Sequence, residues 1–268
     1  GRAFRTFNQV EGDPTSLSDT WVCSLALDAQ GDLWAGTRQG GANRYDARKG
    51  TFIRYQHQED VTGSLSDNNV HAIFSDAQGR LWLGTNAGLD LFDPNTQTFS
   101  HYQLPDADEF SVHAIAQDPQ GMLWLGTPHA LWRFDPAGSA FASFTPDEKS
   151  FPVNAILAHP DGSLWLTGVG SGLLHFTPPS AEFTQYLDKD GVSENTQGLW
   201  LDPSGRIWVG TYAGLALFDP ATQTFAHYRH DPNIATTLNS NIIFSLYQDR
   251  SGVLWVGSYG GSLSTYDP

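Results

Sequence analysis

Polar side chains recur at equivalent positions of a repeated sequence pattern, where the neighbouring residues are apolar. Imidazole is a common zinc ligand, so two histidines at this position could hold a metal ion together with further ligands. The alternative, which we favour, is that these groups hydrogen-bond to one another or to water, as buried polar groups generally do. The position lies five residues before a repeated turn and holds Cys23, His71, His113, Asn154, Gln197 and Phe244.

Other candidate binding residues stand in predicted loops. Trp21, Tyr212 and Tyr259 occupy loop or strand-start positions where most repeats carry no aromatic residue, and such rings can stack on a sugar. Loop oxygens such as those of Asp19 and Asp67 could hold calcium, or they could cap their own loops. The sequence thus predicts a ligand-binding site without a resident cofactor, built from Trp21, Arg38, Gln39, Asn68, Asn69, His71, His113, Asn154, Gln197, Tyr212, Asn241 and Tyr259.

No pattern typical of a catalytic centre accompanies these residues. The sequence contains no nucleophile elbow, phosphate-binding loop, dinucleotide fingerprint or zinc motif. We therefore name no catalytic residue and no metal ligand. Calcium stays open as an alternative because it needs six to eight oxygens rather than a fixed motif.

The elements that must position these residues form a repeat. A tryptophan follows a short turn in every unit, and in five of six turns an Asp precedes a Gly by three residues, which is typical of a hairpin turn. The fourth turn has His159 in place of the Asp. The spacing of about 41 to 48 residues indicates six repeats, with motif tryptophans at Trp34, Trp82, Trp124, Trp165, Trp208 and Trp255.

Each repeat contains four short apolar or aromatic runs, which predict four antiparallel strands. This pattern is the signature of a propeller blade. We therefore predict an all-β protein, a six-bladed β-propeller of four-stranded antiparallel blades that forms a single domain over residues 1–268. The last repeat ends after its third strand, and Phe4-Arg-Thr-Phe7 matches a fourth strand. Residues 1–9 are predicted to complete the last blade and close the ring; the alternative is that both ends belong to a longer array.

The connections between strands differ in length. Fourteen residues separate the last aromatic residue of a predicted fourth strand from the next first strand at Val22, Val70 and Ile243. Only eight or nine residues form this connection before the other first strands. Extra glycines occur at Gly41 and Gly261, in the connections between second and third strands. Because function tends to lie in variable loops on a rigid frame, we expect the ligand at the end of the blades where these connections meet.

The composition limits the classes of molecule that this protein is expected to bind. The 268 residues carry a net charge of −15 with a pI near 4.7, and no basic cluster interrupts this charge. Nucleic acid is an unsuitable partner, because its phosphates require clustered Lys and Arg. No apolar run is long enough to cross a bilayer, so direct membrane insertion is not expected. A neutral or cationic small molecule or saccharide fits the acidic loops better than a polyanion.

The repeat resembles the two-component regulator propeller repeat, found in periplasmic sensor regions of bacterial hybrid histidine kinases and related signalling proteins. The resemblance rests on Ser64-Leu-Ser-Asp-Asn-Asn-Val70, Leu81-Trp-Leu-Gly-Thr85 and Phe92-Asp-Pro94. It implies a periplasmic or extracellular location, a role in signal transduction, and downstream signalling domains outside this chain; a cytoplasmic location stays open. Members often carry seven blades per ring rather than six.

Three functions are consistent with these features. The leading hypothesis is a non-catalytic ligand-sensing propeller of a bacterial signalling protein. The alternatives are a metal-dependent hydrolase or lyase of the six-bladed propeller type, and a scaffold that binds other proteins. A cation held by three or more loop oxygens would favour the enzyme, and binding of a folded protein alone would favour the scaffold.

Overall fold

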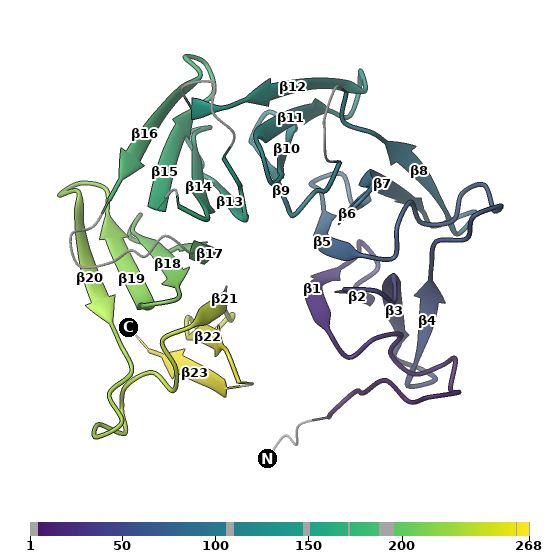
Figure 1. The fold of residues 1–268 in the computed structure, drawn as a ribbon, viewed down its shortest axis with the longest axis horizontal. Helices are drawn as coiled ribbons and strands as arrows, with labels where there is room; N and C mark the ends of the chain where they lie inside the picture. The colour runs from purple at the N-terminus through teal and green to yellow at the C-terminus, as the bar shows by residue number, and fades with distance from the viewer. Residues whose placement is uncertain are drawn as a thin grey trace. The chain divides into compact units, whose positions relative to one another are not determined.

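The structure is a computed structural model that describes residues 5–105, 110–146, 151–170, 172–187, 196–260 and 262–267, without the side chain of residue 197. The described residues contain 23 β-strands and no α-helix (Figure 1). The chain divides into two compact units, which are described separately. The first comprises residues 1–117 and 134–141, and the second residues 118–133 and 142–268.

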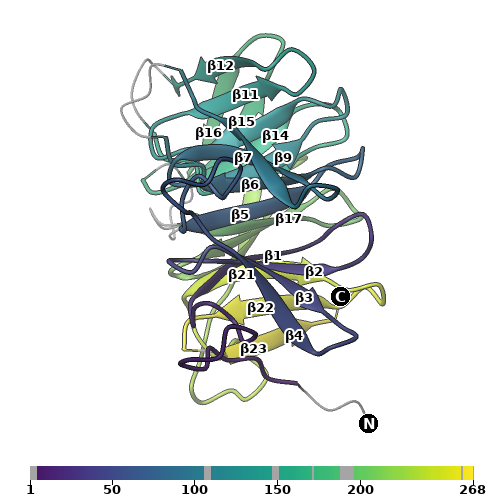
Figure 2. The ribbon, with the colours of Figure 1, turned by 90° about the vertical axis from the view of Figure 1, so that its right-hand side faces the viewer.

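The first unit contains two complete four-stranded antiparallel sheets, of order β1-β2-β3-β4 and β5-β6-β7-β8. Figure 2 shows β4 turned well away from the direction of β1, as the twist of a sheet requires. The strands are β1 (Val22–Leu27), β2 (Leu33–Thr37), β3 (Ala42–Asp46), β4 (Thr51–Tyr55), β5 (Val70–Ser75), β6 (Leu81–Thr85), β7 (Gly88–Asp93) and β8 (Thr98–Tyr102).

The third sheet has the order β12-β11-β10-β9, and the division between the units falls within it. Its strands are β9 (Ala114–Gln117), β10 (Leu123–Gly126), β11 (Leu131–Asp135) and β12 (Ala140–Phe144).

The second unit contains the fourth and fifth sheets, each with four strands, and a sixth sheet with three described strands, β21-β22-β23. The strands are β13 (Ala155–Ala158), β14 (Leu164–Gly168), β15 (Gly172–Thr177), β16 (Glu182–Tyr186), β17 (Thr196–Leu201), β18 (Ile207–Thr211), β19 (Gly214–Asp219), β20 (Thr224–Tyr228), β21 (Ile243–Gln248), β22 (Leu254–Ser258) and β23 (Ser262–Tyr266). The prediction of an all-β, six-bladed propeller is confirmed by these six antiparallel sheets.

The repeated tryptophans join successive sheets. All six lie on the second strand of their sheets, and the rings of the first five each contact an aromatic ring on the third strand of the next sheet. Such pairs add edge-to-face attraction to the burial of large apolar surfaces. The ring centroids are separated by 4.8 Å for Trp34–Phe92, 5.7 Å for Trp82–Phe134, 5.5 Å for Trp124–Phe176, 5.4 Å for Trp165–Phe218 and 5.1 Å for Trp208–Tyr266.

The turn before each tryptophan explains why Asp and Gly recur there. Gly79 takes a positive φ of 78°, which Gly adopts without steric cost. Asp76 accepts the backbone N–H groups of Gln78 and Arg80 through Oδ1, and its Oδ2 accepts the indole N–H of Trp82 at 2.8 Å. The same bond from indole to carboxylate forms at Trp34, Trp124 and Trp255.

The Gly and Thr after the tryptophan also have structural roles. A Cβ on Gly84 would lie 2.5 Å from the carbonyl oxygen of Val112, which lies just before the first strand of the next sheet. Only Gly therefore permits the two backbones to come this close. Thr85 is buried, and its hydroxyl donates to the carbonyl of Gly88 across the turn to the third strand. The motif therefore fixes both the spacing of the sheets and the start of the connection between the second and third strands.

The N-terminal segment lies against the first sheet. Phe7 packs on Tyr45 and Phe52 with centroid separations of 5.0 Å and 5.3 Å, and Arg5 donates to the Tyr45 hydroxyl at 2.6 Å. Residues 5–9 belong to no strand, and residues 1–4 lie outside the described residues. The closure of the last blade by residues 1–9 therefore stays a prediction.

Candidate functional site

The loops expected to carry function lie at one end of the sheets in each unit. In the first unit, the N–H of Arg38 donates to the carbonyl of Trp21, and the N–H of Gly41 donates to that of Asn68. In the second unit, the N–H of Tyr259 donates to the carbonyl of Ile242. These bonds join connections into first strands with connections between second and third strands. We call this end of the sheets the loop end.

Trp21 and Arg38 form one pair of predicted site residues at the loop end of the first sheet. The Trp21 ring is 60% exposed, and the Arg38 guanidinium carbon lies 5.0 Å from its centroid. Asp19 holds the two segments together, because its carboxylate accepts the N–H groups of Trp21 and Gln39. Leu17 packs instead with Ala35 and Phe52, so Trp21 is free of that core cluster.

Asn68 and Asn69 have different environments although they are adjacent. The Asn68 side-chain oxygen accepts the N–H of His57 at 2.8 Å, which closes the long loop before β5. Asn69 is partly buried, and its Oδ1 has no hydrogen-bond partner among the described residues. Asp67 caps the same loop by accepting the N–H of Asn69 at 2.7 Å.

His71 and His113, on β5 and before β9, meet in a polar cluster of the first unit. Their ring centroids are 4.4 Å apart. His71 Nε2 lies 2.8 Å from Asn86 Oδ1, and His113 Nε2 lies 2.9 Å from the hydroxyl of Ser111, which also reaches Asn86 at 3.2 Å. The hydrogen-bonded interpretation therefore describes this cluster, and its four polar groups bind one another.

Tyr212 and Tyr259 are brought together by a third aromatic residue, Phe244 on β21. The Phe244 ring lies 5.9 Å from Tyr212 and 6.3 Å from Tyr259. All three rings are exposed, to 40%, 43% and 64% for Tyr212, Phe244 and Tyr259. We call these three residues the aromatic group. It lies entirely within the second unit.

The remaining predicted residues of the second unit do not join this group through a described side-chain contact. Asn154 donates its backbone N–H to Thr167 at 2.7 Å. Asn241 accepts the N–H of His230 at 2.7 Å and so closes the long loop before β21, as Asn68 does before β5. Gln197 lies on β17, and its side chain lies outside the described residues.

Sequence reasoning missed Asn86, Ser111 and Phe244. Asn86 follows the motif threonine directly, as Arg38, Tyr212 and Tyr259 follow theirs or its serine counterpart, so alignment of the repeats could have found it. Phe244 shares the position of His71 and His113 but is apolar there. Ser111 gave no signal, because it stands in a short connection without repeated spacing.

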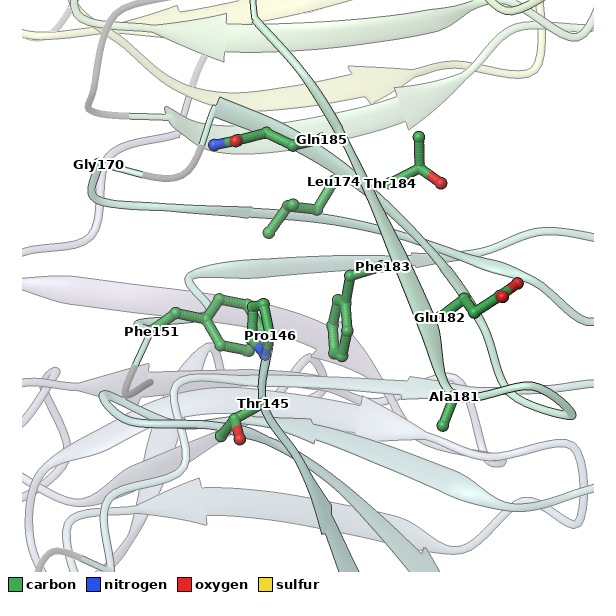
Figure 3. A pocket seen from close by; sticks show the side chains of 10 residues that line it. All are labelled: Thr145, Pro146, Phe151, Gly170, Leu174, Ala181, Glu182, Phe183, Thr184 and Gln185. Atoms are coloured by element: carbon green, nitrogen blue, oxygen red, sulfur yellow. The ribbon is translucent and has the colours of Figure 1, made fainter. Parts of the chain in front are cut away.

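A separate cavity of about 740 Å³ lies beside the fourth sheet (Figure 3). Phe151 and Phe183 form its apolar side with centroids 5.5 Å apart, and Glu182 and Gln185 add polar groups from β16. Residues 147–150, which follow the lining residue Pro146, lie outside the described residues.

The described residues include no group of three or more His, Cys, Asp or Glu side chains suited to a metal ion. Asp19 and Asp67, expected as calcium ligands or loop caps, accept backbone N–H groups of their own loops. In the described part of the chain, no helix is long and apolar enough to cross a bilayer.

Comparisons with known proteins identify the repeat. The family model described as "Two component regulator propeller" matches residues 16–39, 64–87, 107–129 and 237–260. Each of these segments contains the first strand and the Trp-x-Gly motif of one sheet, and together they include Trp21, His71 and Tyr259. No curated protein matches the chain significantly.

Several solved structures share the fold. An extracellular domain assigned to the hybrid two-component system BT3049 of B. thetaiotaomicron is 24% identical, with a TM-score of 0.72 over 97% of this chain and 41% of that one. PorZ of Porphyromonas gingivalis, from the type-IX secretion system, is 20% identical, with a TM-score of 0.72 over 95% of this chain and 39% of its own. The chain thus spans about two fifths of these proteins.

A Staphylococcus aureus virginiamycin B lyase is also similar, with 12% identity and a TM-score of 0.73 over 97% of this chain and 87% of the lyase. At such identity the likeness extends to the fold alone. The family match rests instead on residues of the repeat itself. Four segments of the chain match the two-component regulator propeller repeat, which confirms the resemblance seen in its sequence.

Proposed function

We propose that this propeller is a non-catalytic ligand-binding domain of a bacterial sensor protein. The observation that carries the proposal is the aromatic group at the loop end of the second unit. Three large rings stand exposed there at positions where most other repeats have non-aromatic residues. Exposed aromatic residues that converge on a rigid frame are typical of binding surfaces rather than of packing.

The frame explains how these rings keep their places. Tyr212 follows Thr211, whose buried hydroxyl donates to the carbonyl of Gly214 at 2.8 Å. Tyr259 is fixed by the bond from its N–H to Ile242. Phe244 follows the buried Ile243 at a bulge in the pairing of β21 with β22. A ligand that stacks on these rings would meet a surface ordered before binding, which reduces the entropic cost of binding.

The chemistry of the surface favours a neutral or cationic cyclic ligand, such as a saccharide. Aromatic faces attract the C–H surface of sugars and cations. The net charge of −15 repels polyanions at low salt, and this repulsion weakens as salt is raised.

We also propose a periplasmic or extracellular location and a role in signal transduction. The support is the family match together with the fold shared with an extracellular domain assigned to a two-component system. Signalling output would then belong to other domains of the same protein or of a partner. A tagged full-length protein, located by cell fractionation, would test the proposed compartment.

The binding test uses thermal shift with oligosaccharides and divalent cations, including neutral and sulfated oligosaccharides of equal length. A ligand that prefers the folded state raises Tm. For a ligand found this way, Tyr212→Ala and Tyr259→Ala should each weaken binding about tenfold, since a lost aromatic contact costs roughly 1–2 kcal/mol.

Tyr247→Ala is the matched control, because Tyr247 is 65% exposed but is no member of the aromatic group. It should leave the affinity unchanged. Equal weakening by all three variants, or tighter binding of the sulfated ligand at low salt, would contradict the proposal.

A further inference from the structure

The aromatic group of the second unit differs from the ring pairs that pack successive sheets together. Its centroid separations are 5.9 Å between Tyr212 and Phe244 and 6.3 Å between Phe244 and Tyr259. The five pairs formed by the motif tryptophans are closer, at 4.8–5.7 Å, and those tryptophans are buried. The three rings of the aromatic group are spread apart and exposed, so their faces are accessible to a ligand.

The planes of the three rings are steeply inclined to one another. The plane of Phe244 makes an angle of 77° with that of Tyr212 and of 51° with that of Tyr259. A sugar ring offers a flat face, which stacks on one aromatic ring or between parallel rings. It therefore cannot lie flat on Phe244 and on a neighbouring tyrosine at the same time. A compact group with C–H surface on every side suits inclined rings better.

The backbone holds the rings in this arrangement. Ile243 is opposite Ser258 in the register of β21 with β22, and the bulge that follows leaves Phe244 without a partner residue on β22. Such a bulge re-aims the side chain of its extra residue. Tyr259 directly follows the buried Ser258, as Tyr212 follows the buried Thr211. Each ring thus stands next to a buried residue of a strand end.

The surroundings of the rings determine which cation fits. The segments that carry the rings, residues 209–214, 239–245 and 256–260, contain no charged side chain. A primary ammonium has three N–H donors, which need acceptors once water is removed. A quaternary ammonium has no N–H donor, and its charge is attracted directly by the faces of aromatic rings. The absence of a carboxylate on these segments therefore favours the quaternary cation.

We propose that the aromatic group binds a quaternary ammonium group, whose nitrogen carries four carbon substituents. The positive charge lies against the faces of Tyr212, Phe244 and Tyr259, and the methyl groups occupy the space between the inclined rings. The net charge of −15 raises the concentration of such cations near the protein. This proposal rests on the ligand-binding function proposed above, and it narrows that function from neutral or cationic ligands to one cationic group.

The experiment compares choline with two molecules that share either its shape or its charge. One is the neutral isostere of choline, in which a tert-butyl group replaces the trimethylammonium group. The other is ethanolamine, which has the charge but carries N–H donors in place of methyl groups. Titration with the protein, followed by NMR of the small molecules, gives the dissociation constant of each. Choline should bind at least about tenfold more tightly than either, because several ring faces attract its charge together.

The methyl signal of choline reports directly on the rings. Protons held over the faces of aromatic rings are shifted upfield, and this shift should reach saturation during the titration. Ethanolamine controls for the general attraction of cations to an acidic protein, and this attraction falls as salt is raised. The preference for choline over ethanolamine should therefore persist at high salt, when both bind more weakly.

Substitutions in the protein separate the ring faces from the apolar surface. Tyr212→Leu, Phe244→Leu and Tyr259→Leu each keep an apolar side chain and remove one ring face. Each should weaken choline about fivefold, and each should change the affinity for the neutral isostere by less than about twofold. Tyr259→Phe retains the ring and should leave choline binding unchanged.

Tyr247→Leu is the matched control for these substitutions. Tyr247 lies on β21 as Phe244 does and is exposed, but it is no member of the aromatic group. Its replacement should leave the affinity for choline unchanged. All four rings are exposed, so none of the changes should prevent folding, and an unchanged Tm would show this.

Three results would overturn the proposal. Equal affinities for choline and its neutral isostere would show that apolar shape selects the ligand. Equal affinities for choline and ethanolamine would assign the binding to the net charge of the protein. Choline binding that is unchanged in all three leucine variants of the aromatic group would place the cation elsewhere.

A neutral oligosaccharide in the same titrations separates this proposal from the proposed function. If choline does not bind, but the oligosaccharide binds and Tyr212→Ala weakens it, the ligand-binding function stands and the quaternary ammonium is wrong. If neither choline nor any oligosaccharide of the thermal-shift test binds, both proposals are wrong.

Discussion

At the scale of single residues, the most unusual group is Asp90, which is fully buried on β7. Its carboxylate accepts the N–H of Ser66 at 2.9 Å and contacts His101 Nδ1 at 2.8 Å. Burial raises the pKa of Asp90, and these two partners offset the effect only in part. Asn43 takes the same position in the first sheet and accepts the N–H of Ser18 at 2.9 Å. A neutral amide therefore suffices to hold a long loop.

Asp90→Asn should become more stabilising relative to the wild type as pH rises from about 4 to 7. An unfolded Asp titrates near pH 4, whereas folded Asp90 keeps its proton to higher pH. The folded chain thus binds more protons in this window, and its free energy of unfolding falls as pH rises. Urea denaturation at both pH values measures the difference, which we expect to be of the order of 1 kcal/mol.

Asp93→Asn is the control with the opposite sign. Hydrogen bonds from Asn95 and Thr96 lower the pKa of Asp93, so the wild type should gain stability over this variant as pH rises toward the ordinary Asp pKa near 4, with little further change up to pH 7. A pH-independent effect of Asp90→Asn would show that Asp90 is not protonated in the folded chain near pH 4 to 7.

At the scale of the element, the turn before each tryptophan has one exception. His159 replaces the Asp of the fourth turn and lies 2.8 Å from Asp161. Burial alone would raise the pKa of Asp161, but bonds from Ser163 and His159 outweigh it and lower the pKa to about 2. The Asp161 carboxylate thus binds residues of its own turn. In the second sheet, Asp76 accepts the indole N–H of Trp82. In the fourth turn, the position equivalent to Asp76 carries His159 instead of a carboxylate.

The double variant His159→Asp with Asp161→Ser should stabilise the protein. It gives the fourth turn the sequence Asp-Pro-Ser-Gly of residues 202–205 and offers a carboxylate to Trp165. The added hydrogen bond to a charged group should raise the free energy of unfolding by ~1 kcal/mol, measured at pH 7 as an increase in Tm. The reverse change, Asp202→His, should lower Tm. A decrease in both variants would mean that the His159–Asp161 pair is the better turn for this sheet.

At the scale of the whole molecule, stability comes from contacts between successive sheets. Trp82 is 1% exposed and its ring contacts Tyr102 and Phe134. Trp255 belongs to the sixth sheet, is partly exposed, and contacts no other aromatic ring among the described residues. In a repeat protein, the energy of each unit is largely that of its interfaces with its neighbours.

Trp82→Ala should therefore cost more stability than Trp255→Ala. The first change removes a packed ring and leaves a cavity, at ~3–5 kcal/mol. The second removes the bond to Asp249 but little packing. Chemical denaturation of the two variants measures the difference in their free energies of unfolding. Trp21→Ala, at an exposed ring, should give the smallest loss of the three. Equal losses for Trp82 and Trp255 would show that the Trp255 face is covered in solution.

The sequence by itself determined the architecture, because each repeat contains the residues that its own turns and strands require. The Asp-x-x-Gly turns, the Trp-x-Gly-Thr strands and the aromatic fourth strands all depend on neighbours within one repeat or the next. Backbone requirements such as the positive φ of Gly79 are local, and a glycine with positive φ therefore recurs at this position in all six turns.

Only the tertiary structure decided which predicted site residues meet. Asn68 and Asn241 were predicted as binding residues, yet their side chains close loops, and their possible contact with a ligand stays a prediction. His71 was joined by Asn86 and Ser111, and Tyr212 and Tyr259 by Phe244. These groupings form between loops of neighbouring sheets, where the side chains vary from repeat to repeat. Their geometry depends on the packing of one sheet against the next, which no single stretch of sequence encodes.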